Sequence, residues 1–206
     1  MKDFGNLKIG ILALQGAVAE HVQSVQKCGA SAVAVRREPA IIKELDGLIL
    51  PGGESTTIGR LGSLYGFREE IRNLAAGGKP LFGTCAGLVL LAEEVEGQDP
   101  LLPLLSVSVK RNAYGRQRES FEADLEIEAL GSEPFCGVFI RAPRITSVSR
   151  EVEILAEFEN TIVGVRQGNI IATAFHPELT DDLRIHRYFL LQALESRASR
   201  TPSTAS

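Results

Sequence analysis

Short apolar runs alternate with segments of helical spacing along the first half of the chain. Residues 8–14 form a mostly apolar run closed by a Gln-Gly pair, which predicts a buried strand leading into a loop. In residues 17–28 apolar side chains recur at steps of three and four and Gly29 follows, which predicts a helix ending there. The cycle repeats, with strands expected at 32–35, 47–50 and 80–82, a short helix at 41–45, a loop at 51–55 and a helix at 67–76. This alternation predicts an α/β fold in which helices cover both faces of a mostly parallel sheet.

The second half of the chain changes to a period of two. Between Phe121 and Glu128 apolar residues alternate with acidic ones, which predicts a strand with one face in solvent. We interpret the acidic stripe as a solvated strand face rather than as a metal or partner surface. Further short strands are expected at 138–140, 152–156, 161–165 and 170–174. These strands are expected to extend the parallel core with antiparallel additions, giving a mixed sheet.

The chain is predicted to end in a helix followed by a tail. A helix is expected from about Thr180 to about Arg197, because Asp181 and Asp182 would lie in its first turn, where the helix dipole favours negative charge. Residues 198–206 show no apolar periodicity and are expected to be a disordered tail. The 206 residues suit one domain, which we place at residues 1–197.

Composition excludes several classes of function. The 44% hydrophobic and 23% charged content is ordinary for a globular protein, and a net charge of -4 offers no broad basic field for nucleic acid. No apolar run approaches the ~20 residues of a membrane span and no signal peptide opens the chain, so a cytoplasmic location is expected. Three cysteines are too few for a disulfide framework and lack the spacing of a zinc site, so no metal is expected.

Cys85 is the cysteine with a reactive context. The pattern Gly83-x-Cys85-x-Gly87 has the form of a nucleophile elbow, in which a short strand turns sharply on the reactive residue and a helix follows. Glycines are expected beside the turn because side chains there would collide and because glycine tolerates unusual backbone angles. Cys28 and Cys136 are interpreted as inert packing residues.

A thiol needs electrostatic help to act as a nucleophile at neutral pH. His176 is the candidate base, since it follows a predicted strand, whereas His21 and His186 lie inside predicted helices. Carboxyl ends of parallel strands share one sheet edge, so Cys85 and His176 can meet there. Glu178 is close enough along the chain to orient the imidazole, as the third member of a triad.

Attack on an amide or ester carbonyl also requires donors for the developing oxyanion. The backbone amide of Ala86 is one candidate, at the start of the helix after the elbow. The loop containing Gly52 and Gly53 follows another predicted strand at the same edge, and its glycines allow close approach of backbone to a ligand. Taken alone, this loop would more simply be an ordinary strand-to-helix turn.

Together these motifs resemble a three-layer class I glutamine amidotransferase with a Cys-His-Glu triad. The closest resemblance is to the glutaminase subunit of pyridoxal 5'-phosphate synthase. It rests on residues 14–17, 50–57, 82–88, 120–125, 137–143 and 175–180. The elbow alone would indicate only the broad superfamily, whereas the combination of these segments is specific to the glutaminase subunit.

The resemblance implies hydrolysis of L-glutamine to glutamate and ammonia through a thioester on Cys85. No cofactor is implied for this subunit. His176 would be the general acid and base and Glu178 its orienting partner, while the oxyanion would lie against Gly53 and Ala86. The implied glutamine-binding residues are Gly52, Gly53, Glu54, Arg111, Ile140 and Arg141. For Arg111 this is physically sensible, because a guanidinium can pair with the carboxylate of an amino acid.

The resemblance also implies a partner. Ammonia would pass through a tunnel to a separate synthase subunit, which makes pyridoxal 5'-phosphate from a pentose phosphate and a triose phosphate. The glutaminase is expected to be poorly active until that subunit docks near Gln15 and Gly16. The chain departs from the family pattern chiefly at residues 96–106 and in its tail, where we expect no effect on any motif.

Two alternatives remain open on the residues alone. One is a catalytically idle binding or regulatory relative with the same fold, against which the intact Cys85, His176 and Glu178 argue. The other is a cysteine hydrolase of peptides or esters, which would turn over such substrates without a partner.

Overall fold

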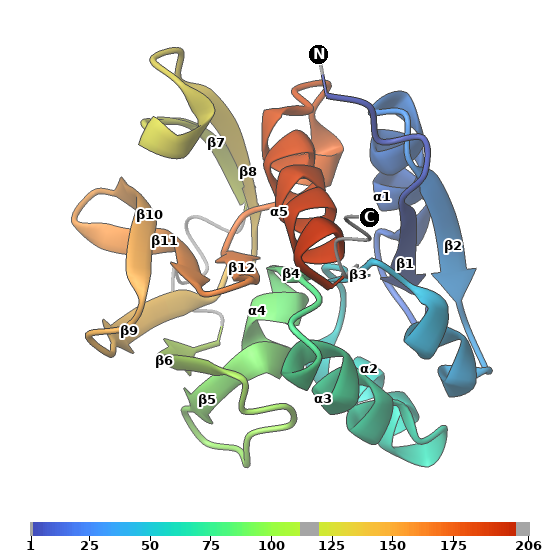
Figure 1. Ribbon diagram of the computed structural model, residues 1–206. Helices are drawn as coiled ribbons and strands as arrows, with labels where there is room; N and C mark the ends of the chain where they lie inside the picture. Colours follow the sequence, from blue (N-terminus) through green and yellow to red (C-terminus); the bar gives the residue numbers. More distant parts are fainter. Residues whose placement is uncertain (1, 112–119, 201–206) are drawn as a thin grey trace.

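A computed structural model describes residues 2–111 and 120–200. Its centre is a seven-stranded sheet in which five neighbouring strands are parallel and two antiparallel strands extend one edge (Figure 1). In order across the sheet the strands are β10 (Glu153–Phe158), β11 (Thr161–Gln167), β12 (Ile170–Thr173), β4 (Leu81–Thr84), β3 (Gly47–Leu50), β1 (Lys8–Leu12) and β2 (Ser31–Val35). The predicted α/β class with a mixed, mostly parallel sheet is therefore confirmed.

Helices lie on both faces of this sheet. One face carries α1 (Val18–Lys27) and α5 (Arg184–Arg200), and the other carries α2 (Ser55–Leu64), α3 (Phe67–Ala76) and α4 (Ala86–Leu91) (Figure 1). Short 3-10 helices occur at η1 (Pro39–Glu44), η2 (Glu128–Leu130) and η3 (Pro177–Leu179). Strands β1, β3 and β4 are buried almost throughout and mostly apolar, as expected for parallel strands between helix layers.

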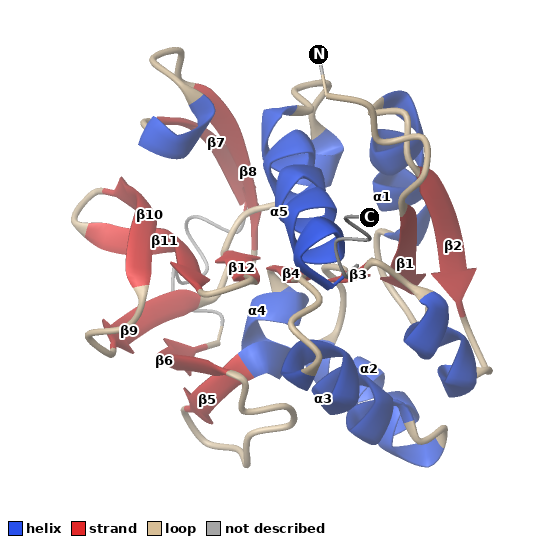
Figure 2. Cartoon of the chain, in the orientation of Figure 1, coloured by secondary structure: helices blue, strands red, loops and turns tan. Residues whose placement is uncertain are grey.

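Two small sheets flank the central one, and the sequence did not predict this division. Strands β5 (Ala92–Val95), β6 (Leu105–Lys110) and β9 (Arg144–Val148) form one, and β7 (Ser120–Leu125) with β8 (Phe135–Ile140) forms the other. Figure 2 shows these strands gathered at one side of the molecule. Of the strands expected as antiparallel additions, β10 and β11 extend the central sheet and β12 lies within it, parallel to β4. Strand β7 pairs with β8 apart from it.

Two helices differ from what the sequence predicted. Helix α2 was not predicted, because two threonines and two glycines lower its intrinsic helix propensity. The last helix begins at Arg184 rather than near Thr180, since Asp182 accepts hydrogen bonds from the Arg184 backbone and side chain and stands before the helix. That helix also continues to Arg200, so residues 198–200 are helical and the rest of the expected tail lies outside the described residues.

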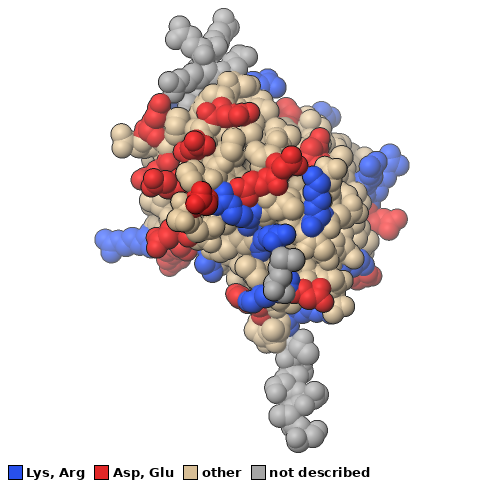
Figure 3. Space-filling model, turned by 90° about the horizontal axis from the view of Figure 1, so that it is seen from above, with Lys and Arg blue, Asp and Glu red and all other residues tan. Residues whose placement is uncertain are grey.

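Charged side chains of both signs lie on the face of the molecule seen in Figure 3. On the face seen in Figure 3, acidic and basic side chains are interspersed over the described residues. The acidic side chains of Glu122 and Asp124 on β7 are exposed, as the solvated-face interpretation expected. Among the helices of residues 2–111 and 120–200, none has the length and apolar character needed to cross a membrane.

Candidate active site

The elbow at Cys85 joins the central strand β4 to helix α4. Cys85 has φ 48° and ψ -97°, an uncommon conformation for a residue with a side chain. A Cβ on Gly83 would lie 2.7 Å from the Gly87 carbonyl carbon, and one on Gly87 would lie 2.0 Å from the Leu50 oxygen. The expected collision is therefore present, but the unusual backbone angles fall on Cys85 itself rather than on the glycines.

His176 reaches the same edge of the sheet from the end of β12. Its backbone amide donates to the carbonyl of Val138 at 2.8 Å, which fixes the chain against β8. Its ring Nδ1 lies 2.8 Å from Oε1 of Glu178, and both side chains are buried. Glu178 belongs to the one-turn helix η3, whose first residue is Pro177. The predicted histidine and carboxylate are therefore in direct contact.

The electrostatics of this pair favour a charged imidazole. Burial alone would lower the pKa of His176, but its hydrogen bonds to Cys85 and Glu178 and the charges of those groups raise that pKa to about 10. Burial likewise acts to raise the pKa of Glu178, and the neighbouring His21 and His176 together hold it below its ordinary value. Glu178 is therefore ionised at neutral pH and His176 can carry the proton that a leaving amine needs.

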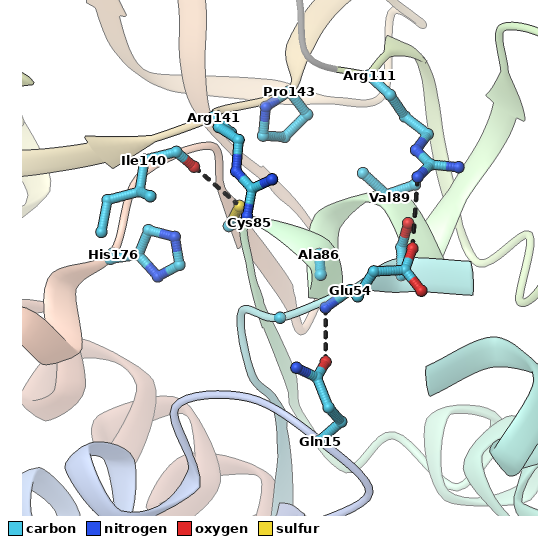
Figure 4. Close-up of a pocket in the computed structure, with 12 residues that line it drawn as sticks. Gln15, Glu54, Cys85, Ala86, Val89, Arg111, Ile140, Arg141, Pro143 and His176 are labelled. Atoms are coloured by element: carbon cyan, nitrogen blue, oxygen red, sulfur yellow. Dashed lines mark hydrogen bonds and ion pairs between the residues drawn. The ribbon is translucent and has the colours of Figure 1, made fainter. Parts of the chain in front are cut away.

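Cys85 and His176 open onto a pocket of about 310 Å³ at the carboxyl ends of β3, β4 and β12 (Figure 4). Its lining residues are Gln15, Gly53, Glu54, Ser55, Cys85, Ala86, Val89, Arg111, Ile140, Arg141, Pro143 and His176. The volume suits a small molecule of the size of an amino acid. Of the residues predicted for the site, Gly16, Gly52 and Glu178 are absent from this lining, and Glu178 lies behind His176.

Gly52 and Gly16 lie directly behind the pocket wall. A Cβ on Gly52 would lie 2.3 Å from Cε1 of His176, so glycine lets the imidazole pack on the backbone. Gly16 has φ 109°, and a Cβ there would lie 1.7 Å from the Gly52 oxygen. Beside it, Oε1 of Gln15 accepts from the backbone amide of Glu54 at 2.6 Å. The loop expected to meet a partner is thus packed on the loop expected to bind substrate.

A charged pair forms the wall opposite the triad. Hydrogen bonds from the Thr57 hydroxyl and from the amides of Thr56 and Thr57, at the start of α2, lower the pKa of Glu54 to about 2. Nη2 of Arg111 lies 3.4 Å from Oε1 of Glu54. Figure 4 shows the two side chains together, across the cavity from His176.

Arg111 also contacts a segment that was expected to leave the site untouched. Its Nη1 donates to Oε1 of Gln98 at 2.9 Å and to the Thr56 hydroxyl at 3.1 Å. Gln98 lies within residues 96–106, where the chain departs from the family pattern. A side chain of this segment therefore contacts a residue predicted to bind substrate, and this contact was not predicted.

The remaining wall comes from the turn after β8. The carbonyl oxygen of Ile140 lies 4.0 Å from the Cys85 sulfur. Arg141 follows with φ 42°, so two residues of this pocket have backbone angles that side chains rarely adopt. Ala86 is the first residue of α4, and its amide therefore has no partner within that helix.

Sequence reasoning missed several residues of the site. Ser55 and Pro143 line the pocket although neither was given a role within its motif, and Val89 lines it just outside the elbow motif. Gln15 lines it too, although it was assigned only to a partner contact. Within residues 2–111 and 120–200 no group of three His, Cys, Asp or Glu side chains could hold a metal ion.

Known proteins are similar to this chain over nearly its whole length. The SNO glutamine amidotransferase family matches residues 11–195. The pyridoxal 5'-phosphate synthase subunit PdxT of Geobacillus sp. (strain WCH70) is 55% identical over 193 residues, covering 93% of this chain and 100% of that protein. The protein of the same name from Moorella thermoacetica is 55% identical over 185 residues, covering 89% of this chain and 98% of its own length.

Solved structures share the fold. A crystal structure described as a glutamine amidotransferase is 49% identical with a TM-score of 0.85, covering 90% of this chain and 98% of that one. The structure of PurLQS from Thermotoga maritima has a TM-score of 0.67 at 17% identity, covering 93% of this chain and 97% of the matched one. The second likeness concerns the fold alone.

Proposed function

The chain belongs to the SNO glutamine amidotransferase family, and on this premise we propose that it is the glutaminase subunit of a pyridoxal 5'-phosphate synthase. It hydrolyses L-glutamine to L-glutamate and ammonia. Relatives of that name at 55% identity support the assignment, as they extend over almost the whole chain. The single observation that carries the chemistry is the 2.8 Å contact of His176 with Glu178 beside the pocket that contains Cys85.

The reaction proceeds in two halves. The Cys85 thiolate attacks the side-chain amide carbon of glutamine, forming a carbon–sulfur bond and a tetrahedral oxyanion. His176 donates its proton to the amide nitrogen as the carbon–nitrogen bond breaks, which releases ammonia and leaves a γ-glutamyl thioester. Water then attacks the thioester while His176 takes its proton, and glutamate leaves as the thiolate is restored. Glu178 holds Nδ1 throughout, so that Nε2 is the nitrogen that exchanges protons.

Backbone amides stabilise the oxyanion in this scheme. The two candidates are the amide of Ala86, at the start of α4, and that of Gly53, in the loop after β3, and both residues line the pocket with Cys85. Removal of one such donor typically costs ~3 to 4 kcal/mol of transition-state stabilisation. A side-chain substitution at these residues leaves the backbone amides in place. Their contribution is therefore tested by substitutions that change the conformation of the turn.

Charged groups of the pocket match an amino acid. Glu54 presents a permanent negative charge to the α-ammonium group, and Arg111 a positive charge to the α-carboxylate. Gly52, Gly53, Ile140 and Arg141 complete the wall between these charges and Cys85. No cofactor is required for these steps, because acid, base and nucleophile are all side chains of this chain.

The ammonia passes to a separate synthase subunit, which docks near Gln15 and Gly16 and uses a pentose phosphate and a triose phosphate. Movement of the Gln15 loop on docking would act on Gly52 and Glu54 through the contacts described above. The complex works in the cytoplasm in this proposal.

The test supplies the synthase with alternative nitrogen sources. With both sugar phosphates present, formation of pyridoxal 5'-phosphate is followed by absorbance, using either glutamine or an ammonium salt. Glutamine should support formation only when this chain is added, and ammonium should support it without the chain. Formation from glutamine by the synthase alone, or none with both proteins, would refute the proposal. Turnover of peptides or esters by the chain alone would favour the cysteine hydrolase instead.

A further inference from the structure

Two histidines that the triad does not use lie directly behind it. His21 on α1 and His186 on α5 are both fully buried, at 0% exposure. Nδ1 of His21 lies 3.0 Å from Nε2 of His186, and both rings pack against Phe82 in T-shaped arrangements. Buried histidines require partners or a function, because an imidazole in an apolar core loses its hydration.

His21 faces the carboxylate of the triad. Its Nε2 lies 3.4 Å from Oε2 of Glu178, the oxygen that His176 does not use, and 3.2 Å from the hydroxyl of Thr84. Oε2 is buried and has no hydrogen-bond partner among the described residues, so His21 and Glu178 approach one another here without a formed hydrogen bond. His21 thus supplies the N–H group that faces this oxygen.

The contacts decide which nitrogen of His21 carries the proton. If Nδ1 were protonated, the Nε2 lone pair would face the Glu178 carboxylate, and Nδ1 of His186 would be a buried N–H without a partner. If Nε2 is protonated, His186 donates to Nδ1 of His21, and only an acceptor nitrogen of His186 is left unpaired. Buried N–H groups without a partner are rarer in proteins than buried acceptors without one. Protonation of His21 at Nε2 is therefore favoured.

We propose that His21 is a positioning residue of the catalytic triad, whose Nε2–H holds the second oxygen of Glu178 and so fixes the carboxylate toward Nδ1 of His176. The inference rests on the proposed function and deepens it. His186 sets the His21 tautomer from α5, and Thr84 shares the same N–H. The Thr84 hydroxyl also accepts a hydrogen bond from the amide of Gly52 at 3.0 Å. His21 is therefore linked through Thr84 to the loop proposed to bind the substrate.

The charged and titratable surroundings agree with a neutral His21. The groups facing it are Glu178 and His176 from the strand end, His186 from α5 and Glu20 from its own helix. Burial lowers the pKa of His21 and outweighs the carboxylates that act to raise it. A neutral ring with Nε2 protonated can donate to Glu178 without adding a buried charge.

The test compares two amides at position 21. His21→Gln places an amide nitrogen near the position of Nε2, whereas His21→Asn reaches only as far as Nδ1. Glutamate release is measured for each variant in complex with the synthase. His21→Asn should lower kcat 10- to 100-fold with KM within twofold, and His21→Gln should restore most of that loss. Losses of 10- to 100-fold are typical when the hydrogen-bond partner that orients a metal-bound histidine is removed, and the orienting role proposed here is of the same kind.

A spectroscopic readout separates this inference from the proposed function. The Nδ1–H proton of His176 should be visible by NMR in the native chain and in His21→Gln, and should be lost to exchange in His21→Asn. This signal needs no glutamine, so it reports on the triad even where the chain hydrolyses nothing. A kcat within twofold of native in His21→Asn, or equal losses in both variants, would overturn the inference.

Should His21→Asn not fold, His186→Leu applies the same test from one residue further out. It removes the donor to Nδ1 of His21, and we expect kcat to fall at least threefold with KM unchanged. A native kcat and a native His176 proton signal in a folded His186→Leu chain would contradict the proposal.

Discussion

Cys85 holds a backbone conformation that costs of the order of 1–3 kcal/mol for a residue with a side chain. The surrounding packing enforces it, since β3, β4 and α4 approach so closely at Gly83 and Gly87 that a Cβ on either glycine would collide. Such local strain is common where a nucleophile must project from a sheet edge. The proposed attack geometry therefore depends on the two glycines as much as on the thiol.

Arg111 provides the first prediction at the residue scale. Arg111→Ala should raise KM for glutamine at least tenfold and change kcat much less, because the guanidinium binds a part of the substrate that does not react. Lys110→Ala is the matched control, as Lys110 precedes it on β6 and pairs only with the exposed Glu96 in the described structure. Steady-state kinetics with the synthase present measure both, and an equal effect of the two substitutions would contradict the proposed role.

The sequence predicted where Cys85, His176 and Glu178 lie better than it predicted the contacts around them. Cys85, His176 and Glu178 stand in local motifs whose spacing along the chain already carries their geometry. His21 and His186 could only be placed inside helices, because the face that each helix turns to the sheet depends on tertiary packing. The contact of Gln98 with Arg111 was missed for a similar reason, since no local pattern joins a loop to a strand end.

At the scale of elements, helix α2 links stability to substrate binding. Its N-cap is Glu54, whose side chain accepts from two backbone amides, so the residue proposed to bind glutamine also begins the helix. The helix itself escaped prediction because its composition is poor in helix-forming residues, and the cap compensates. Elements with a clear apolar period, such as α3, were predicted to their bounds.

Two substitutions separate these roles of Glu54. Glu54→Ala should lower the free energy of unfolding by about 1 kcal/mol through loss of the cap, whereas Glu54→Ser keeps a capping oxygen and should cost only a few tenths. Both should raise KM for glutamine, because both remove the carboxylate. Urea denaturation and kinetics measure the two effects, and equal stability of the two variants would show that the cap matters little.

At the scale of the whole molecule, buried histidines make stability depend on pH. Burial, with a smaller contribution from the neighbouring His21, lowers the pKa of His186 to about 3, and burial also lowers the pKa of His21. Groups with a depressed pKa are neutral in the folded chain and take up protons on unfolding, so stability is full above about pH 6.5 and lost as pH falls. The raised pKa of His176 has the opposite effect. The stability that its folded-state contacts contribute is present below about pH 6.5 and is lost as the pH rises toward 10.

Thermal unfolding between pH 7 and pH 5 tests this effect. His186 alone should cost ~2 kcal/mol at pH 5, as each pH unit below 6.5 contributes about 1.36 kcal/mol. Carboxylates with lowered pKa values titrate below this window. His186→Leu should therefore show a shallower fall in melting temperature, and parallel curves for the two proteins would contradict the assignment.

Glutamate release from glutamine, by the native chain and by Cys85→Ala with the synthase present, tests the central claim most directly. We expect native hydrolysis and at least a thousandfold loss in Cys85→Ala, with the melting temperature retained, because the thiol is the attacking group. Cys28→Ala and Cys136→Ala should keep native rates. Glutamate release by Cys85→Ala at a rate near native would contradict the account.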